Sequence, residues 1–453
     1  MLITYQYSVY PTTEQKLHLN KTRRICQYLY NRLLSERFDW WENNRCYINA
    51  CPLWSCALPV LKDKPDQMSQ QSLLPFLKKD LVMVEWSGEL LDLSTVYSQV
   101  LQDVVHRVDK AFKRYIQGDS KGKRSGKPRF KGEARYRSFT YTQSKNDWLE
   151  GDYINLPKIG LIKVKYHRPI LKGFTVKTCQ VIKKSDGWYI NLALEDKSVP
   201  DFTPDEIKPN EDNSLGIDMG LEKFLTVSDG DIVPIYQPLR DNQEKLTKIS
   251  QKKNKRKKGS KRRRKLAKKE AKLHQKIART RRDNHFKVAN KLGDKDAKVF
   301  FVEDLNLKGL IKRNKPKQDE QGNYLPNHQS QKSGMNKSWG DAGVGQFLDI
   351  LSYKAENAGK KVIRVNPNYT SQICCSCNAH VPKTLSDRIH SCDCGLVLDR
   401  DWNGSLNIKR VGLDVFPTIK RCKGKDKGIR VIPNATSTLK EILELPRSPH
   451  HTD

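Results

Sequence analysis

The chain has 453 residues, which is too long for one ordinary domain and predicts two to four folding units. Its 84 lysines and arginines exceed its 51 aspartates and glutamates by 33, which favours a polyanionic partner such as DNA, RNA or an anionic membrane. No apolar run approaches the length of a membrane span, and the first residues lack a secretory pattern. These features argue against membrane and secreted proteins, so we expect a cytoplasmic one.

The first part of the chain alternates between strand-like and helical patterns. Residues 2–10 predict a strand and are followed by a helical stretch. A second helix is expected from Ser94, as its N-cap, to Gly118. Its apolar face is formed by Tyr97, Leu101, Val104, Val108 and Phe112. Residues 120–132 are rich in glycine and lysine and predict a mobile basic loop, which either contacts phosphate or faces solvent.

Residues 150–195 change to a period-two alternation with a turn at 185–187, which predicts an antiparallel sheet or small barrel. The polar, proline-containing stretch 197–213 is expected to be a linker. Beyond it, the second lobe begins with residues 215–220, and residues 224–235 predict two strands that turn at 228–230. The apolar runs 299–302 and 361–365 predict two more strands, with helices between them. The second lobe is therefore expected to hold an α/β sheet.

Residues 251–282 contain eighteen lysines and arginines. Leu266, Leu273 and Ile277 follow helical spacing, so the segment predicts a basic helix that buries a thin stripe and tracks a nucleic-acid backbone. The alternative is a solvated charged helix. Residues 411–453 show little periodicity and predict a mobile tail.

Three acidic residues occupy positions suited to a nuclease of the RNase H type. Asp218 lies in a predicted strand, Glu303 ends the buried strand and Asp401 precedes a predicted helix. Carboxylates at the ends of neighbouring strands can hold two divalent cations, one to activate water and one to stabilise the leaving oxygen. Asp399 begins a run that resembles a calcium loop, but position twelve of that run is Arg410 instead of glutamate. We therefore prefer Asp401 as the catalytic residue, with Asp399 positioning Arg400 or capping the helix.

Five cysteines lie within about twenty residues, a spacing that favours metal binding over disulfides. Four of them form two close pairs, typical of a structural zinc site. They are Cys374, Cys377, Cys392 and Cys394. Cys375 is spare, and His380 and His390 could act as substitute ligands, but a surface position is the preferred interpretation of each histidine. The scattered cysteines are expected to be core or surface thiols: Cys26, Cys46, Cys51, Cys56, Cys179 and Cys422.

Several motifs across the chain resemble those of TnpB, the RNA-guided nuclease family of bacterial insertion sequences, which is also similar to compact type V CRISPR effectors. They are KPRFKG (127–132), SFTYTQ (138–143), GIDMGL (216–221), KLHQKIARTRRDNHFKV (272–288), FVEDLNLKGL (301–310), NYTSQICCSC (368–377) and CGLVLDRDWNGSLNIKR (394–410), with YxYxxYPTxEQ-like residues at 5–15.

The resemblance implies a multidomain α+β and α/β protein. Residues 1–45 would start a wedge-like β-barrel that continues over 126–205, with a helical recognition lobe over 46–125. Residues 206–410 would form a RuvC-like nuclease domain with a basic helical insertion (251–290) and a zinc-binding insert (368–398), followed by a tail over 411–453.

The resemblance also implies a function. It places cleavage at Asp218, Glu303 and Asp401 with Mg²⁺ or Mn²⁺, beside a structural Zn²⁺. The implied partners are one guide RNA per protein and double-stranded target DNA beside a short flanking motif, in the cytoplasm of a bacterium near the nucleoid. Nucleic-acid contacts are expected from Lys127, Arg129, Lys261, Arg262, Arg263, Arg264, Lys268, Lys272, Lys276 and Arg279.

Three other functions compete with this one. A nuclease-inactive guide-dependent repressor would be expected to lack an acidic residue, whereas all three are present. A type V effector serving a CRISPR array would share the same residues. A transposase would usually carry its acids in the order Asp-Asp-Glu instead of the observed Asp-Glu-Asp. Two departures from the family pattern are the Cys392-x-Cys394 spacing and the insert 313–334.

Overall fold

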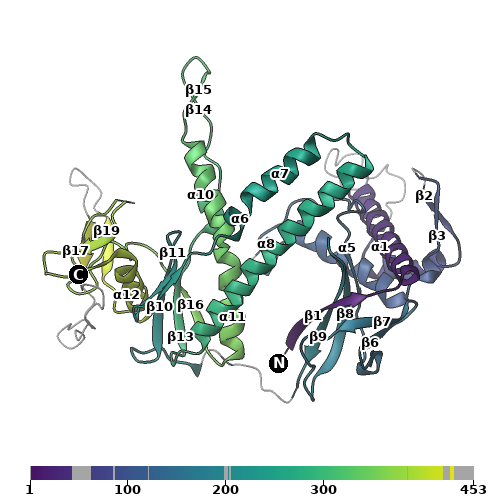
Figure 1. Cartoon of the computed structure of the whole chain (residues 1–453), viewed down its shortest axis with the longest axis horizontal. Helices are drawn as coiled ribbons and strands as arrows, with labels where there is room; N and C mark the ends of the chain where they lie inside the picture. Colours follow the sequence, from purple (N-terminus) through teal and green to yellow (C-terminus); the bar gives the residue numbers. More distant parts are fainter. Residues whose placement is uncertain are drawn as a thin grey trace, which may run out of the picture. The chain divides into compact units, whose positions relative to one another are not determined.

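The computed structural model describes residues 2–42, 63–84, 87–120, 122–197, 203, 206–384, 386–421 and 429–432 (Figure 1). The chain divides into two compact units, Met1–Asp201 and Phe202–Asp453, at a point inside the predicted linker. Among the described residues, no helix is both long and apolar enough to span a membrane. Cys46, Cys51, Cys56, Cys422 and residues 433–453 lie outside the described part.

Unit 1 is built on a seven-stranded antiparallel sheet with the order β4-β8-β9-β1-β7-β6-β5. The strands are β1 (Leu2–Tyr10), β4 (Ser138–Tyr141), β5 (Leu149–Glu150), β6 (Tyr153–Leu156), β7 (Gly160–Lys165), β8 (Thr175–Lys183) and β9 (Trp188–Glu195). The predicted hairpin at 185–187 is confirmed, because Lys183 pairs with Trp188 across it. The order has two ends, β4 and β5, so hydrogen bonding forms a half-barrel, which corrects the expected barrel.

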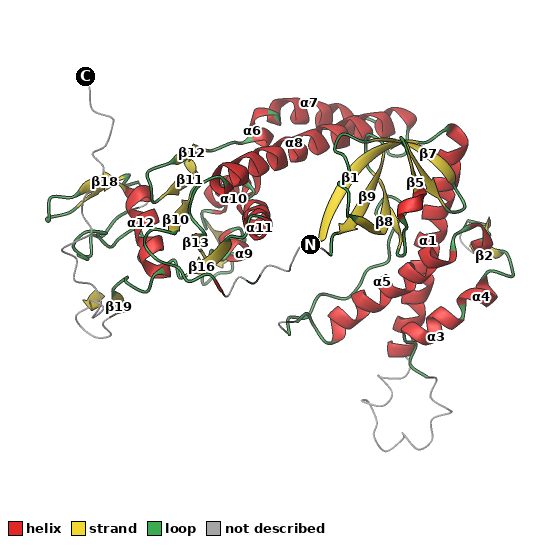
Figure 2. Ribbon diagram, turned by 90° about the horizontal axis from the view of Figure 1, so that it is seen from below, coloured by secondary structure: helices red, strands yellow, loops and turns green. Residues whose placement is uncertain are grey.

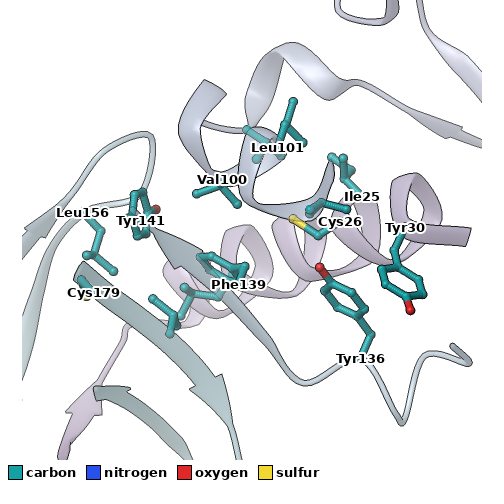
Figure 3. Packing of buried hydrophobic residues seen from close by; sticks show 14 of the residues in the cluster. Ile25, Cys26, Tyr30, Val100, Leu101, Tyr136, Phe139, Tyr141, Leu156 and Cys179 are labelled. Carbon is teal, nitrogen blue, oxygen red and sulfur yellow. The ribbon is translucent and has the colours of Figure 1, made fainter. Parts of the chain in front are cut away.

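Two long helices pack with this sheet, α1 (Thr13–Trp40) and α5 (Ser98–Ile116). Thr12 caps α1 through a capping box with Gln15. Figure 3 shows buried side chains of both helices meeting Phe139 and Tyr141 of β4, and Cys26 beside Tyr136, which precedes that strand. Burial raises the pKa of Cys26 to about 12, so this thiol is an inert core group, as is Cys179. One core therefore joins the segments expected to form a separate recognition lobe and barrel.

Short elements complete the described part of unit 1: α3 (Gln67–Ser72), α4 (Leu74–Leu77), β2 (Val82–Val84), β3 (Glu89–Leu91), and the 3-10 turns Leu93–Thr95 and Asn146–Trp148. The expected N-cap at Ser94 is wrong. Asp92 accepts hydrogen bonds from Ser94 and closes a 3-10 turn there, and α5 begins only at Ser98.

Unit 2 contains a five-stranded mixed sheet with the order β12-β11-β10-β13-β16. Its strands are β10 (Ser214–Met219), β11 (Lys223–Val227), β12 (Ile232–Pro234), β13 (Val299–Glu303) and β16 (Lys361–Val365). β10, β13 and β16 are parallel, whereas β11 is antiparallel to its neighbours. The predicted strands and the turn at 228–230 are confirmed.

Helices cover both faces of this sheet (Figure 2). On one face, α8 (Lys261–Gly293) and α11 (Val344–Asn357) pack on Ile217, Phe300 and Val302. On the other, α12 (Arg400–Gly412) contributes Ile408 to a cluster with Val299 and Phe301. A strand covered on both sides must be apolar throughout, which explains the run VFFV in β13.

The basic segment forms two helices instead of the single helix expected over 251–282. α7 (Gln243–Asn254) ends before Gly259, whose φ of 85° breaks the helix, and Ser260 caps α8 by accepting from the Arg263 amide. Lys253 pairs with Glu270 between the two helices, which run side by side in Figure 1. Ile277 is buried and Leu266 and Leu273 are half-buried, so the predicted thin stripe is present.

The other described elements of unit 2 are α6 (Pro238–Asp241), α9 (Leu307–Leu310), β14 (Lys317–Gln318), β15 (Tyr324–Leu325), α10 (Gln329–Ala342), β17 (Ile389–Ser391), β18 (Val397–Asp399), β19 (Thr418–Arg421) and β20 (Ile429–Ile432). β19 and β20 pair within the stretch expected to be a structureless tail. The insert 313–334 holds the β14–β15 hairpin and the start of α10.

Candidate active site

The three acidic residues come from three different elements of unit 2. Asp218 lies near the end of β10, and Glu303 is the last residue of β13. The parallel register pairs Ile217 with Val302, so Asp218 and Glu303 are the next residues of two adjacent strands. Asp401 lies in the first turn of α12. All three line one cavity of about 420 Å³. Among the described residues that line it, none belongs to the insert 313–334.

Glycines allow α12 to approach the sheet closely enough to bring Asp401 to this cavity. A Cβ on Gly216 would lie 2.1 Å from the Ser405 carbonyl oxygen of α12, and one on Gly404 would lie 2.9 Å from the Asp218 carboxylate. Side chains two residues apart on a strand share a face, so Gly216 and Asp218 both point towards α12. The helix backbone therefore rests directly on β10, with the Asp218 carboxylate against Gly404.

The carboxylates of this cavity destabilise one another. Burial, followed by the negative charges of Glu303 and Asp401, raises the pKa of Asp218 well above its ordinary value, while Arg400 opposes the shift. Burial also raises the pKa of Glu303, and a hydrogen bond from the Thr370 hydroxyl (2.7 Å) opposes it. A divalent cation among these oxygen ligands would remove the repulsion, so the donor set fits a hard metal ion.

Asp399 has a different role from Asp401. It is the N-cap of α12, and its carboxylate accepts hydrogen bonds from the amides of Asp401 and Trp402. Its other oxygen accepts from Lys223 at 2.6 Å. Arg400 instead pairs with Asp401 at 3.0 Å. Capping and pairing occupy the Asp399 carboxylate, so the structure favours Asp401 as the acid available to a metal ion.

Four cysteine sulfurs gather beside the cavity in the arrangement expected for zinc. The Sγ atoms of Cys374, Cys377, Cys392 and Cys394 all lie within 4.8 Å of one another. The Cys374–Cys394 separation of 3.8 Å is close to the roughly 3.8 Å edge of a tetrahedron with Zn–S bonds of about 2.3 Å. Gly395 adopts a φ of 87° directly after the second pair, which permits its tight spacing. The sulfur geometry therefore fits a closed structural site.

The remaining candidate ligands of this element have other contacts. The amide of Cys375 donates to the Asn403 side chain, and its thiol is outside the four-sulfur group. His380 contacts Gln372 at 3.0 Å, and the fully buried His390 contacts Lys383. None of the three contributes a ligand atom to the four-sulfur group.

Two fully buried asparagines of α12 connect this cysteine element to the acidic cavity. Asn407 donates to the carbonyls of Thr370 (2.8 Å) and Ile373 (2.7 Å), and Asn403 donates to Ile373 (2.9 Å). Thr370 in turn donates to Glu303. The helix that carries Asp401 therefore also fixes the loop that orients Glu303. Periodicity gave no indication of this network, although Thr370 lies within the NYTSQICCSC motif.

Comparison with known proteins finds similarity along most of the chain. Family models match residues 1–46 (a helix-turn-helix domain), 195–314 (a probable transposase of the OrfB_IS605 type) and 345–408 (a Cas12f1-like TNB domain). A putative RNA-guided DNA endonuclease of Streptomyces pristinaespiralis is 26% identical over 415 residues, covering 90% of this chain and 89% of the relative. The protein InsQ of Escherichia coli K12, with the same description, is 27% identical over 416 residues, covering 91% and 92%. The TnpB-like protein L79 of Acanthamoeba polyphaga mimivirus is 29% identical over 224 residues, covering 48% and 40%.

The chain is similar to the two endonuclease-named relatives along about nine-tenths of its length. The structure adds one point to the family-model description of residues 1–46. Their described part forms β1 and the single helix α1, so this segment contributes a sheet strand and a packing helix instead of a helix-turn-helix.

Three basic side chains line the acidic cavity, and sequence reasoning did not assign any of them to it. Lys383, Arg388 and Arg400 line the cavity, and Lys383 is fixed by a 2.9 Å hydrogen bond to the Ser371 carbonyl. They lie in a stretch with few other cations, so charge density gave no signal. Arg388 pairs with Glu222 at 2.8 Å.

The predicted nucleic-acid contacts fall in two places. Most lie exposed on α8: Lys261, Arg262, Arg264, Lys268, Lys272, Lys276 and Arg279. Arg263 differs, because its guanidinium donates to the carbonyls of Lys253 and Arg256 and joins α8 to the end of α7. In unit 1, Arg129 is exposed and Lys127 pairs with Glu42 at 2.9 Å.

Proposed function

We propose that this chain is an RNA-guided DNA endonuclease that cuts double-stranded DNA in a RuvC-like site in unit 2. The observation that carries the proposal is the convergence of Asp218, Glu303 and Asp401 on one cavity, where burial, followed by repulsion from the other two carboxylates, raises the pKa of Asp218. Two relatives that match about nine-tenths of the chain are named putative RNA-guided DNA endonucleases, which supports the choice of substrate and guide.

The carboxylates would hold Mg²⁺ or Mn²⁺, which supply an activated water and stabilise the leaving oxygen of phosphodiester hydrolysis. The chain's own residues prepare this site. Thr370 orients the Glu303 carboxylate, and Arg400 pairs with Asp401 at 3.0 Å. Lys383 lines the cavity and supplies positive charge that attracts a phosphate of the strand to be cut.

The partners follow from the same proposal. One guide RNA would pair with the target strand beside a short flanking DNA motif, and the exposed cations of α8 would contact the nucleic-acid backbone without reading bases. Zn²⁺ would stabilise the cysteine element that carries Lys383. The setting is the cytoplasm of a bacterium, close to the nucleoid.

The decisive experiment compares two neighbouring aspartates in the chain purified with its RNA. We expect Asp401→Asn to abolish cleavage of a matched DNA duplex and to retain target binding, because it removes a metal ligand and leaves the basic surfaces intact. Asp399→Asn is the control: asparagine caps a helix about as well as aspartate, so this variant loses the ion pair with Lys223 and should keep both its fold and its cleavage activity. Normal cutting by Asp401→Asn beside an inactive, well-folded Asp399→Asn would reverse the assignment.

A nuclease-inactive repressor is the second candidate, and the intact acidic cavity disfavours it. The same measurement separates the two functions, because a repressor would bind the duplex and leave it uncut with Mg²⁺ present. Sequencing the RNA that co-purifies would distinguish a transposon-derived guide from one encoded by a CRISPR array.

A further inference from the structure

An irregular segment of unit 1 is held in place by a row of polar side chains on α1. Arg23, Gln27 and Asn31 are four residues apart and share one face of the helix. Arg23 donates to the Glu133 carbonyl at 2.5 Å, and Gln27 donates to the Lys131 carbonyl at 2.6 Å. Asn31 accepts from the Lys131 amide at 2.8 Å and donates to its carbonyl at 3.0 Å. These bonds hold the backbone of residues 131–133, directly after Phe130, where no helix or strand does so.

This anchored segment borders a cavity of about 390 Å³ that we call the Phe130 cavity. Its charged and aromatic lining consists of Arg114, Arg129, Lys131, Arg135, Tyr30 and Phe130. None of the described lining residues is acidic. Phe130 is 53% exposed, and its ring meets the Phe38 ring in a T-shaped contact with 5.9 Å between the ring centres. Lys131 holds its ammonium 3.9 Å from the centre of the Tyr30 ring.

This combination of groups suits a single nucleotide. Guanidinium groups bind phosphate through paired hydrogen bonds, and several around one cavity repel one another unless an anion lies between them. An exposed aromatic ring on a fixed backbone offers a stacking surface for a base, and every base has a suitable face. A base inside a duplex has both faces covered, so only an unpaired one can use the ring.

We propose that the Phe130 cavity binds one unpaired nucleotide of a nucleic-acid strand, with its phosphate among Arg114, Arg129 and Arg135 and its base against Phe130. The proposal rests on the proposed function for the nature of the polyanion. It adds a site in unit 1 that is separate from the acidic cavity of unit 2.

The test uses the full chain, freed of RNA, and photo-crosslinking of short oligonucleotides that carry 5-iodouridine or 5-iododeoxyuridine. Mass spectrometry locates the crosslinked residues. We expect single-stranded probes to crosslink within 127–135 and a fully paired duplex of the same sequence to crosslink there at least fivefold less. Comparing the RNA and DNA probes identifies which strand supplies the nucleotide.

Variants give the matched controls. Phe130→Ala should lower crosslinking within 127–135 about 5- to 100-fold, the range expected for loss of one stacked base, and Phe130→Trp should restore it. Phe76→Ala removes another exposed aromatic ring of unit 1, 63% exposed, and should have no effect. Arg129→Gln should reduce the salt dependence of single-strand binding by about one counterion.

Equal crosslinking of the duplex, or an unchanged yield in Phe130→Ala, would overturn the proposal. Equal competition by poly-glutamate would also overturn it, because the cavity would then bind any polyanion. Cleavage assays separate the two proposals. A wild-type chain that crosslinks at 127–135 but cuts no DNA contradicts the nuclease function alone. A cutting chain whose Phe130→Ala variant crosslinks normally contradicts the nucleotide site alone.

Discussion

Replacing Gly216 by alanine should push α12, the helix that carries Asp401, away from the sheet. The added methyl would lie 2.1 Å from the Ser405 carbonyl oxygen and 2.6 Å from the Lys409 amide nitrogen, both backbone atoms of α12. An ordinary contact begins at 3.4 Å, so α12 must retreat by about 1.3 Å from β10. The retreat carries Asp401 away from Asp218, because Asp401 lies on the same helix.

Both activity and stability should respond. A misplacement of roughly 1 Å costs on the order of 100-fold in rate, so cleavage should fall by about that factor. Overpacking costs about 1–3 kcal/mol, which for a unit of this size lowers Tm by roughly 2–12 °C. Single-turnover cleavage of a matched DNA duplex and calorimetry measure the two effects.

A second glycine of the same unit provides the control. Gly340 lies within α10, and a Cβ there has no atom within 4 Å. Gly340→Ala should therefore raise stability by about 0.5–1 kcal/mol and leave cleavage unchanged. Wild-type cleavage and Tm in Gly216→Ala would refute the argument that close backbone contact positions Asp401.

Three further predictions test the cysteine element, the acidic cavity and the basic helix α8. Elemental analysis should find about one zinc per chain, and Cys394→Ser should lower this content and loosen the cysteine element before the sheet unfolds; active protein without zinc would contradict the assignment. The raised pKa of Asp218 makes stability without added Mg²⁺ depend on pH. The stability contributed by protonated Asp218 is complete below the ordinary pKa of 3.8 and is lost as pH rises through the folded-state pKa. The Tm of Asp218→Asn should therefore rise relative to that of the wild type as pH rises. An equal Tm difference at pH 5 and pH 8 would contradict this. Replacing Arg262 and Arg264 together by glutamine should flatten the salt dependence of binding equally for two unrelated guide RNAs. A loss of binding confined to one guide would mean that α8 reads bases.

Local patterns in the sequence predicted much of this protein. Alternation and apolar runs identified most of the strands of both sheets, because a strand buried on both faces, such as β13, must be apolar throughout. The cysteine spacing indicated the group of four sulfurs. The three acidic residues were selected by position, with Asp218 in a predicted strand, Glu303 at the end of one and Asp401 before a predicted helix. The structure places them on one cavity.

Other features depend on contacts between distant residues and left no local signal. Ser94 has the chemistry of an N-cap, but competition from Asp92 turns the chain into a 3-10 turn there. Arg263 resembles its basic neighbours, yet the return of α7 beside α8 assigns its guanidinium to two backbone carbonyls. Residues 120–132 have the composition of a mobile loop, but Gln27 and Asn31, about a hundred positions away, anchor its end.

The sequence by itself determined the element types, the acidic residues and the metal-binding spacing, because hydrophobic period and ligand chemistry are properties of short segments. Only the tertiary structure decided which of these residues act together. The separation of Asp399 from Asp401, the hydrogen bonds that join Thr370 to Glu303, and the close packing at Gly216 all arise where α12 meets the sheet. Such contacts depend on the fit of segments nearly two hundred residues apart, and no local pattern records that fit.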